Sequence, residues 1–245
     1  MLHINLIVAK DPAEAGRLAA DIFQELINAK PDCVLGLATG STPLPLYREL
    51  IEREKAGLIN FSQVRSANLD EYKGLSGDHP QSYRYFMNEN LFNHISIDPA
   101  NTMVPDGLAE DAEAMCAAYE AAVEAMGGVD IQLLGIGHDG HIGFNEPCDH
   151  FPAATHEVEL EEITRQANKR FFDSIDEVPT AAYTMGCGTV MSARKVLLIA
   201  TGKDKAEIVQ KSFFGPVTPM VPASILQFHP DCTVIVDEAA ASLLK

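Results

Sequence analysis

Short apolar runs alternate with longer amphipathic segments along most of the chain. Runs of this kind predict buried strands, and they lie at residues 3–8, 33–38, 64–69, 129–136, 196–200 and 233–236. The run at 64–69 is the least apolar of them. Strands that alternate with helices favour an α/β fold. We therefore predict a single doubly wound, mainly parallel sheet with helices on both faces.

The segments between these runs carry helix signals. Asp11 is placed to cap a helix whose first residue is Pro12, and Glu14 completes a capping box. The buried stripe of this helix is predicted to consist of Leu18, Ile22 and Leu26, with Phe23 and Ile27. Further helices are predicted to start at Thr42-Pro43 and to span 110–126 and 203–213.

Composition narrows the class of protein. The 245 residues include 47% hydrophobic residues, which suits a sizeable core. The net charge is −17, from 18 basic and 35 acidic residues, and argues against nucleic-acid binding. No apolar run reaches the length of a membrane span, and no signal peptide is evident at the start. Five cysteines without a CxxC pair indicate free thiols in the cytoplasm.

The segment 135–147, Gly-Ile-Gly-His-Asp-Gly-His-Ile-Gly-Phe-Asn-Glu-Pro, carries the most chemistry. It directly follows the strand predicted at 129–136. Glycines at the end of a strand let a ligand approach the backbone closely. Asp139, His141 and Glu146 add a titratable set near neutral pH. The segment therefore predicts a catalytic loop at the carboxyl end of a buried strand.

Other interpretations of this loop stay open. Residues 135–140 match the dinucleotide fingerprint, but Gly143 and Pro147 would break the helix that it needs, and residues 157–164 look polar and strandless. His138 and His141 have HxxH spacing, which is compatible with a metal site, although the stretch is not expected to be helical. A structural polar loop is the remaining alternative to acid–base catalysis.

Two further segments end predicted strands. Asp70 and Glu71 are adjacent acids that would point in different directions, one toward a cleft; taken alone, they favour a solvated turn. Residues 39–42, Thr-Gly-Ser-Thr, open a helix and fit either a phosphate cradle or an ordinary N-cap by Thr42. Lys205 and Arg170 are candidates for additional positive charge.

Several motifs coincide with one family. They are residues 35–43 (Leu-Gly-Leu-Ala-Thr-Gly-Ser-Thr-Pro), 68–72 (Asn-Leu-Asp-Glu-Tyr), 79–83 (His-Pro-Gln-Ser-Tyr), the loop 135–147, Arg170-Phe171-Phe172 and the turn 202–205. In this order, over nearly the whole length, the chain resembles the glucosamine-6-phosphate deaminase family, which is made up of isomerising, ammonia-releasing enzymes. The resemblance implies a Rossmann-like fold of the sugar-phosphate isomerase type and a single catalytic domain over residues 1–245. The segment at about 148–179, which is the least regular and follows the loop, is expected to be either a mobile lid or a small helical insertion packed in place.

The resemblance also implies roles for individual residues. Asp70 falls on the base that enolises the sugar. His141 falls on the acid–base group for ring opening, with Asp139 and Glu146 as its partners. The phosphate site falls on Thr39, Gly40, Ser41, Thr42, Arg170 and Lys205, and backbone contacts to the sugar hydroxyls fall on Gly135 and Gly143. The expected partner is an amino-sugar phosphate, with no metal or organic cofactor, no nucleic acid and no membrane, and the protein is expected to be a monomer or a small homo-oligomer.

The chain departs from the family at a few positions. Members activated by an acetylated amino-sugar phosphate bind it with Arg, Lys and Thr, where this chain has His156, Val158 and Glu159, so we expect little or no such activation. Ser41 stands where many members have glycine. The alternative functions are a 6-phosphogluconolactonase of the same fold, a sugar-phosphate sensor domain of a transcription regulator, and a metal-dependent amidohydrolase.

Overall fold

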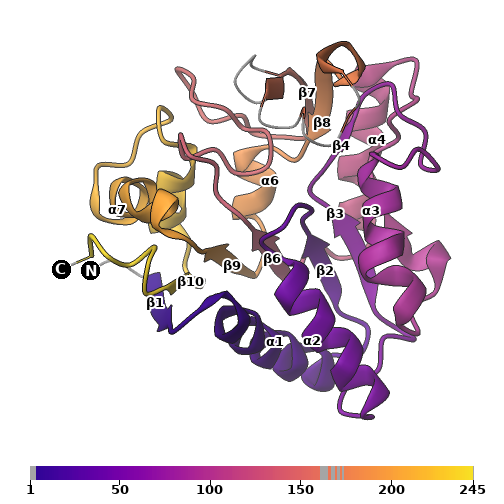
Figure 1. The fold of residues 1–245 in the computed structure, drawn as a ribbon. Helices are drawn as coiled ribbons and strands as arrows, with labels where there is room; N and C mark the ends of the chain where they lie inside the picture. The colour runs from indigo at the N-terminus through magenta and orange to yellow at the C-terminus, as the bar shows by residue number, and fades with distance from the viewer. Residues whose placement is uncertain (1–3, 161–164, 167–168, 170–171, 173, 245) are drawn as a thin grey trace.

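The computed structural model describes residues 4–160, 165–166, 169, 172 and 174–244. Its main feature is a sheet of seven strands, all paired in parallel, in the order β1-β10-β9-β6-β2-β3-β5 (Figure 1). The strands are β1 (Ile4–Ala9), β2 (Val34–Leu37), β3 (Arg65–Asn68), β5 (Thr102–Met103), β6 (Ile131–Leu134), β9 (Lys195–Ala200) and β10 (Cys232–Asp237). The predicted parallel α/β architecture is confirmed.

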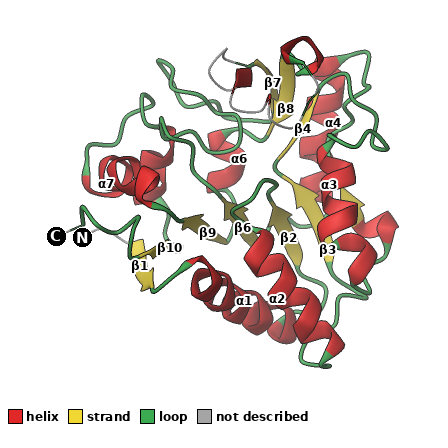
Figure 2. Ribbon diagram, viewed as in Figure 1, coloured by secondary structure: helices red, strands yellow, loops and turns green. Residues whose placement is uncertain are grey.

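Helices lie on both faces of this sheet. The α-helices are α1 (Pro12–Ala29), α2 (Leu44–Lys55), α3 (Tyr83–Asn90), α4 (Ala112–Ala125), α6 (Cys187–Met191) and α7 (Ala206–Phe214). Short 3₁₀ helices are η1 (Phe92–His94), η2 (Pro99–Asn101), η4 (Ile175–Glu177), η5 (Lys203–Lys205) and η6 (Pro222–Phe228). In the view of Figures 1 and 2, α1 and α2 lie below the sheet, and α6 and α7 lie above it. Among the described helices, none combines the length and apolar character that a membrane span requires.

The start of α1 follows the predicted signals with one difference. The Asp11 carboxylate accepts a hydrogen bond from the backbone N–H of Glu14 at 2.8 Å, as an N-cap should. The Glu14 carboxylate accepts from the N–H of Lys10 at 2.6 Å, one residue before the cap. The fully buried face consists of Ala15, Gly16, Ala19, Ala20, Phe23 and Ile27. The prediction is confirmed for Phe23 and Ile27. It was wrong to centre the stripe on Leu18, Ile22 and Leu26, which pack against the core but are only partly buried, while small alanines fill the fully buried face.

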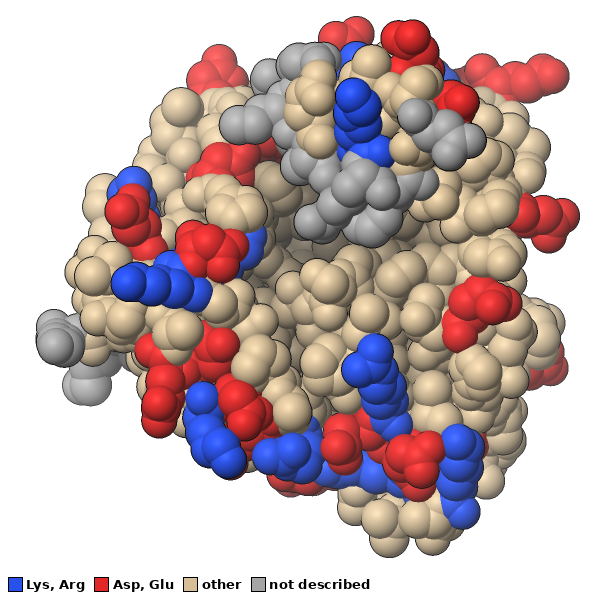
Figure 3. Space-filling view, in the orientation of Figure 1, with Lys and Arg blue, Asp and Glu red and all other residues tan. Residues whose placement is uncertain are grey.

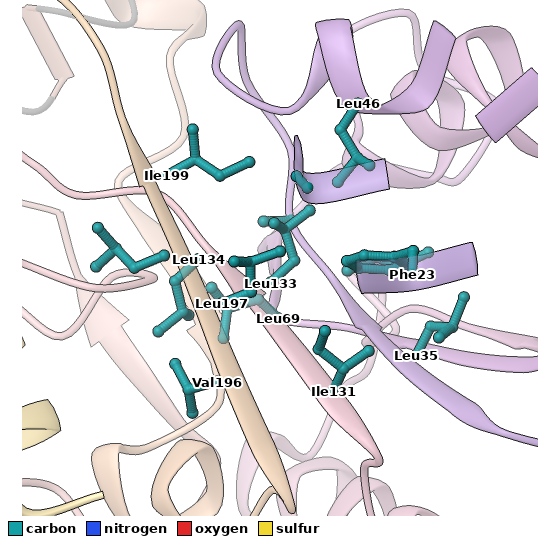
Figure 4. Packing of buried hydrophobic residues seen from close by; sticks show 14 of the residues in the cluster. Phe23, Leu35, Leu46, Leu69, Ile131, Leu133, Leu134, Val196, Leu197 and Ile199 are labelled. Carbon is teal, nitrogen blue, oxygen red and sulfur yellow. The ribbon is translucent and has the colours of Figure 1, made fainter. Parts of the chain in front are cut away.

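The core explains why the strands read as continuous apolar runs. Leu133 of β6 and Leu197 of β9 are almost fully buried, and so are Phe23 of α1 and Leu46 of α2, which pack from one face (Figure 4). A parallel sheet covered on both faces leaves no solvent side, so apolar residues do not alternate with polar ones. Burial of each such side chain stabilises the fold by about 1.5–3 kcal/mol. The result is a rigid platform for the loops at its edge.

A second, smaller sheet was not predicted. It consists of β4 (Asp70–Tyr72), β8 (Ala181–Thr184) and β7 (His156–Glu159), paired antiparallel in the order β4-β8-β7, and it lies at the top of Figure 1. The interpretation of Asp70 and Glu71 as a solvated turn was therefore wrong, since both are buried in a strand. The prediction that residues 157–164 are strandless was also wrong for β7, whereas 161–164 lie outside the described residues.

One residue joins the two sheets. The N–H of Leu69 donates to the carbonyl of Leu37 in β2 at 2.8 Å, and the carbonyl of Leu69 accepts from the N–H of Met185, just after β8, at 2.8 Å. The chain thus leaves the large sheet at Asn68 and enters the small sheet at Asp70 without an intervening loop. These two backbone hydrogen bonds of Leu69 fix the position of the next residue, Asp70.

The segment 148–179, for which we expected a lid, is only partly described. Its described residues include β7 and η4, so it is more regular than the sequence suggested. The lid itself stays a prediction. All five cysteines lie in the described part of the chain as free thiols, four of them buried and Cys148 half-buried.

Candidate active site

The candidate site lies where the strands of the large sheet end. Because all seven strands are parallel, the segments that follow β2, β3, β6 and β9 emerge at one edge, which is where open α/β sheets bind ligands. These segments are 38–43, 69–72, 135–147 and 201–205, and they carry nearly all of the predicted functional residues. Figure 3 shows a hollow in the middle of this face of the molecule.

The loop 135–147 is a series of turns tied to its surroundings, as expected for a non-helical loop. Gly140 and Gly143 have φ of +95° and +60°, which other residues rarely adopt. A Cβ on Gly143 would also lie 2.6 Å from Oγ1 of Thr184 in β8. The side-chain amide of buried Asn145 donates to the carbonyls of Ile142 and Met185, both at 2.8 Å. The small sheet therefore fixes the shape of the loop.

His141 lies between two carboxylates within this loop. Its Nδ1 is 2.8 Å from Oδ1 of Asp139 and 3.7 Å from Oε2 of Glu146. The same Asp139 oxygen accepts the backbone N–H of His141 at 3.0 Å. The imidazole lies directly on Gly137, where an added Cβ would be 2.2–2.4 Å from three ring atoms. With Nδ1 turned toward the acids, Nε2 is the nitrogen available to a ligand.

This arrangement holds a proton on the imidazole. Burial alone would lower the pKa of His141, but the contacts with Asp139 and Glu146 outweigh it and raise the pKa of His141 to about 9. Burial also opposes ionisation of Asp139, and its bonds to His141 outweigh that effect and hold the pKa of Asp139 well below its usual range. At neutral pH the loop therefore presents an imidazolium braced by carboxylates.

Asp70 lies in the opposite kind of environment. It is 6% exposed at the start of β4. Burial, reinforced by the neighbouring charge of Glu71 and opposed by that of His141, raises the pKa of Asp70 to about 8. A carboxyl group with such a pKa is a much stronger base than an ordinary aspartate once it ionises.

Residues 39–42, which are predicted to form a phosphate cradle, lie beside the loop 135–147. Thr42 and Gly135 both line a narrow recess, together with Ala38, Pro43, Leu133, Leu134 and Ile199. Helix α2 begins at Leu44 after Pro43 and has no side-chain cap, so the interpretation of Thr42 as its N-cap was wrong. Gly40 has φ +95° and nothing within 4 Å of an added Cβ, which leaves that turn open.

Lys205 brings a positive charge to the same edge. Its Nζ donates to the carbonyl of Ile136 at 2.9 Å and lies 3.5 Å from Nδ1 of His138. Burial lowers the pKa of Lys205. Lys205 is therefore anchored against the backbone next to Gly135, whereas the other predicted cation, Arg170, lies outside the described residues.

The HxxH pair proposed from the sequence does not form. Nε2 of His138 contacts Oδ2 of Asp204 at 2.8 Å, and the pair is largely exposed. Within the described part of the chain, the group with the spacing of a metal site is Asp139, His141 and Glu146, whose ligand atoms lie within 4.8 Å of one another. An imidazolium between carboxylates accounts for the same spacing.

Sequence reasoning missed three contributors to this site. Gly137 supports the His141 ring, and a glycine four residues before this histidine was a weak signal for close packing. His138 joins Asp204 and Lys205 across 66 and 67 residues, a contact without a local signal. Glu71 was noted only as a neighbour of Asp70, and its partners become visible once α3 is placed.

Comparison with known proteins agrees with this geometry. A family model described as glucosamine-6-phosphate isomerases/6-phosphogluconolactonase matches residues 11–235. Since the match covers most of the chain, the protein belongs to this family of α/β sugar-phosphate enzymes.

Particular relatives are named more narrowly. A glucosamine-6-phosphate deaminase from Clostridium perfringens is 55% identical over 242 residues, covering 99% of this chain and 100% of the relative. Another from Lachnoclostridium phytofermentans is 57% identical over 232 residues, covering 95% and 98%. A solved structure of a monomeric glucosamine-6-phosphate deaminase superimposes with a TM-score of 0.95 at 48% identity, covering 98% of this chain and 99% of that one. A 6-phosphogluconolactonase from Trypanosoma cruzi reaches 0.81 at 22% identity, covering 98% and 97%, and shares the fold.

Proposed function

We propose that this protein is a glucosamine-6-phosphate deaminase, which converts glucosamine 6-phosphate and water to fructose 6-phosphate and ammonia. One observation carries the proposal: His141, held in its charged form, and Asp70, held in its neutral form, lie at one edge of the sheet, where the charge of His141 acts on Asp70. The reaction needs two separate proton transfers, first at oxygen and then at carbon. Full-length relatives at 55% and 57% identity carry that enzyme name.

The first step opens the sugar ring. The substrate is a closed pyranose, so one proton must reach the ring oxygen and another must leave O1. Because the pKa of His141 is about 9, it begins as an imidazolium and donates from Nε2 to the ring oxygen. The neutral imidazole then takes the proton from O1. Asp139 and Glu146 hold the ring orientation through Nδ1.

The second step moves a proton between carbons. Ionised Asp70 takes the proton from C2 of the open chain, and the C–H electron pair forms the C1–C2 double bond. The aldehyde oxygen takes a proton from the substrate's ammonium group, which gives an enolamine. Returning that proton to C1 gives the ketose iminium, which adds water and releases ammonia. The ammonium group of the substrate lies among acids and favours the ionised form of Asp70. No step in this scheme uses a metal or an organic cofactor.

The remaining contacts hold the substrate in place. We assign its phosphate to Thr39, Gly40, Ser41 and Thr42 with Lys205 and Arg170, and its hydroxyls to the backbone at Gly135 and Gly143. Residues 1–245 would act as one catalytic domain, with 148–179 as its lid. We place the enzyme in the cytoplasm, as a monomer or a small homo-oligomer.

The decisive assay measures ammonia and fructose 6-phosphate formed from glucosamine 6-phosphate by the purified protein. Equal amounts of both products are expected, with turnover that survives a chelator. Hydrolysis of 6-phosphogluconolactone without deamination would replace this proposal by the lactonase alternative, which does not require Asp70 as a base. Loss of activity in the chelator would indicate a metal at Asp139, His141 and Glu146.

A further inference from the structure

Glu71 is a buried carboxylate that the scheme above leaves without a task. It is 1% exposed and directly follows Asp70 in β4. Its Oε1 accepts the backbone N–H groups of Tyr72 and Tyr83, both at 2.8 Å, and its Oε2 accepts that of Arg84 at 2.9 Å. Tyr83 and Arg84 are the first two residues of α3, whose N–H groups have no partner within the helix. Glu71 therefore joins β4 to the N-terminus of α3.

This anchor reaches the loop that carries His141. The Tyr83 ring lies 4.7 Å from the Tyr72 ring, centroid to centroid, and is stacked on the Phe144 ring at 6.1 Å with an interplanar angle of 7°. Phe144 belongs to the loop 135–147. The rings thus form a path from the strand of Asp70, through the start of α3, to the loop of His141.

The charge of Glu71 acts on Asp70 as well. Several groups face this pair of acids from the elements packed against it: Tyr47 of α2, Tyr83 and Arg84 of α3, Tyr119 of α4 and His141 of the loop. His141 favours the ionised form of Asp70, whereas Glu71 opposes it. Burial raises the pKa of Glu71, and its backbone donors with the helix N-terminus counteract that effect.

We propose that Glu71 is a positioning residue for catalysis: it fixes α3 and the aromatic path against the loop of His141, and it keeps a negative charge beside Asp70 that makes Asp70 a stronger base. This inference rests on the proposed function. A carboxylate that merely caps α3 would do the first task and not the second, and that difference can be measured.

The test compares three variants with the wild type. Glu71→Gln removes the charge, Glu71→Asp keeps the charge but shortens its reach, and Ser82→Ala is the matched control. The Ser82 hydroxyl accepts the N–H of Tyr85 at 3.0 Å at the same helix end, without a charge. The readouts are the pKa of Asp70 from carbon-13 NMR of its carboxyl group, and the pH profile of kcat/KM.

In Glu71→Gln we expect the pKa of Asp70 and the acid limb of the profile to fall together by about one pH unit. Ser82→Ala should leave both in place, and Glu71→Asp should lose about tenfold in kcat with an acid limb close to wild type. An unchanged pKa of Asp70 in Glu71→Gln would overturn the inference.

If Glu71→Gln does not fold, the test rests on the kcat of Glu71→Asp. A wild-type kcat in Glu71→Asp would contradict the proposal that Glu71 fixes α3 against the loop of His141. A wild type without deaminase activity would instead refute the proposed function, while the NMR comparison would still stand.

Discussion

The two acidic regions of the site are built from the same residue types and behave in opposite ways. In the loop 135–147, Asp139 and Glu146 share a histidine, and the pairing stabilises charge on both sides. In β4, Asp70 and Glu71 are neighbours in a buried strand, and burial favours the neutral acid at Asp70. In the proposed scheme, the surroundings of each acid, and not its residue type, therefore decide whether it serves the proton transfer at oxygen or the one at carbon.

The largest expected effect comes from removing the isolated acid. Asp70→Asn should lower kcat by about 10²–10⁴-fold, because the amide cannot accept the C2 proton. The affinity for substrate should stay within a few-fold of wild type. Steady-state kinetics with ammonia detection measures both quantities, and near-normal turnover would remove Asp70 from the carbon step.

Replacing the paired histidine should damage a different step. His141→Gln should slow net turnover of the cyclic sugar by about 10²-fold, because ring opening loses its proton carrier. Exchange of the C1 proton of fructose 6-phosphate with solvent should be partly retained, since Asp70 acts on the small open-chain fraction. The measurement is the ratio of isotope exchange to net turnover, with Asp70→Asn as the control that loses both.

Equal loss of exchange in these two variants would break the comparison. It would mean that His141 and Asp70 work as one unit, and that the contrast in their surroundings has no separate chemical use.

Two glycines of the loop 135–147 test how the His141 ring is held in place. Gly137→Ala places a Cβ on the His141 ring, so the ring must shift, and kcat should fall by about 10²-fold. Gly135→Ala is the matched control, because nothing in the protein lies within 4 Å of its Cβ. Gly135→Ala should fold with an unchanged Tm and raise KM by about tenfold. An unchanged KM would show that the sugar does not lie against Gly135.

The pH profile tests both regions at once. Asp70 must be ionised to act as a base, and its pKa is about 8, so kcat/KM should fall as the pH drops below that value. His141 must be protonated to donate, and its pKa is about 9, so kcat/KM should also fall above it. The maximum is expected between these values. His141→Gln should lose the alkaline limb. It should also move the acid limb to higher pH, because it removes a charge that favours ionised Asp70.

The smallest effect is expected from an N-acetylated amino-sugar phosphate. The positions where activated family members are expected to bind it carry His156, Val158 and Glu159 in β7, and Glu159 would repel a phosphate. Substrate saturation curves with and without this compound should coincide within about twofold. A large fall in the half-saturating substrate concentration would contradict the prediction.

The sequence predicted six strands of the large sheet because most of them are continuous apolar runs, such as the one that contains β6. It missed β5, which is only two residues long. It did not predict the small sheet, because β4, β7 and β8 are three or four residues long and come from distant parts of the chain. Asp70 is buried because of that sheet. The local pattern of two adjacent acids, taken alone, therefore led to the wrong prediction of a solvated turn.

In the candidate site, too, local contacts could be predicted from the sequence and contacts between distant segments could not. The contact of Asp139 with His141 spans two residues and could be anticipated from the loop alone. The bonds of Glu71 to Tyr83 and Arg84 span 12 and 13 residues and require α3 to be in place. No helix was predicted there, although Ser82 is a good cap.

The order of strands has a consequence for how the chain is made. Among the described strands, β1 comes first in the sequence and pairs with β10, whose residues are 232–237. Central strand β6 likewise enters between β2 and β9, which are separated by more than 150 residues. Parallel pairings between such distant segments form slowly and leave strand edges open meanwhile. The nascent chain therefore carries an unpaired, aggregation-prone β1 until β10 has been synthesised, and a chain truncated before β10 should be a substrate for chaperones.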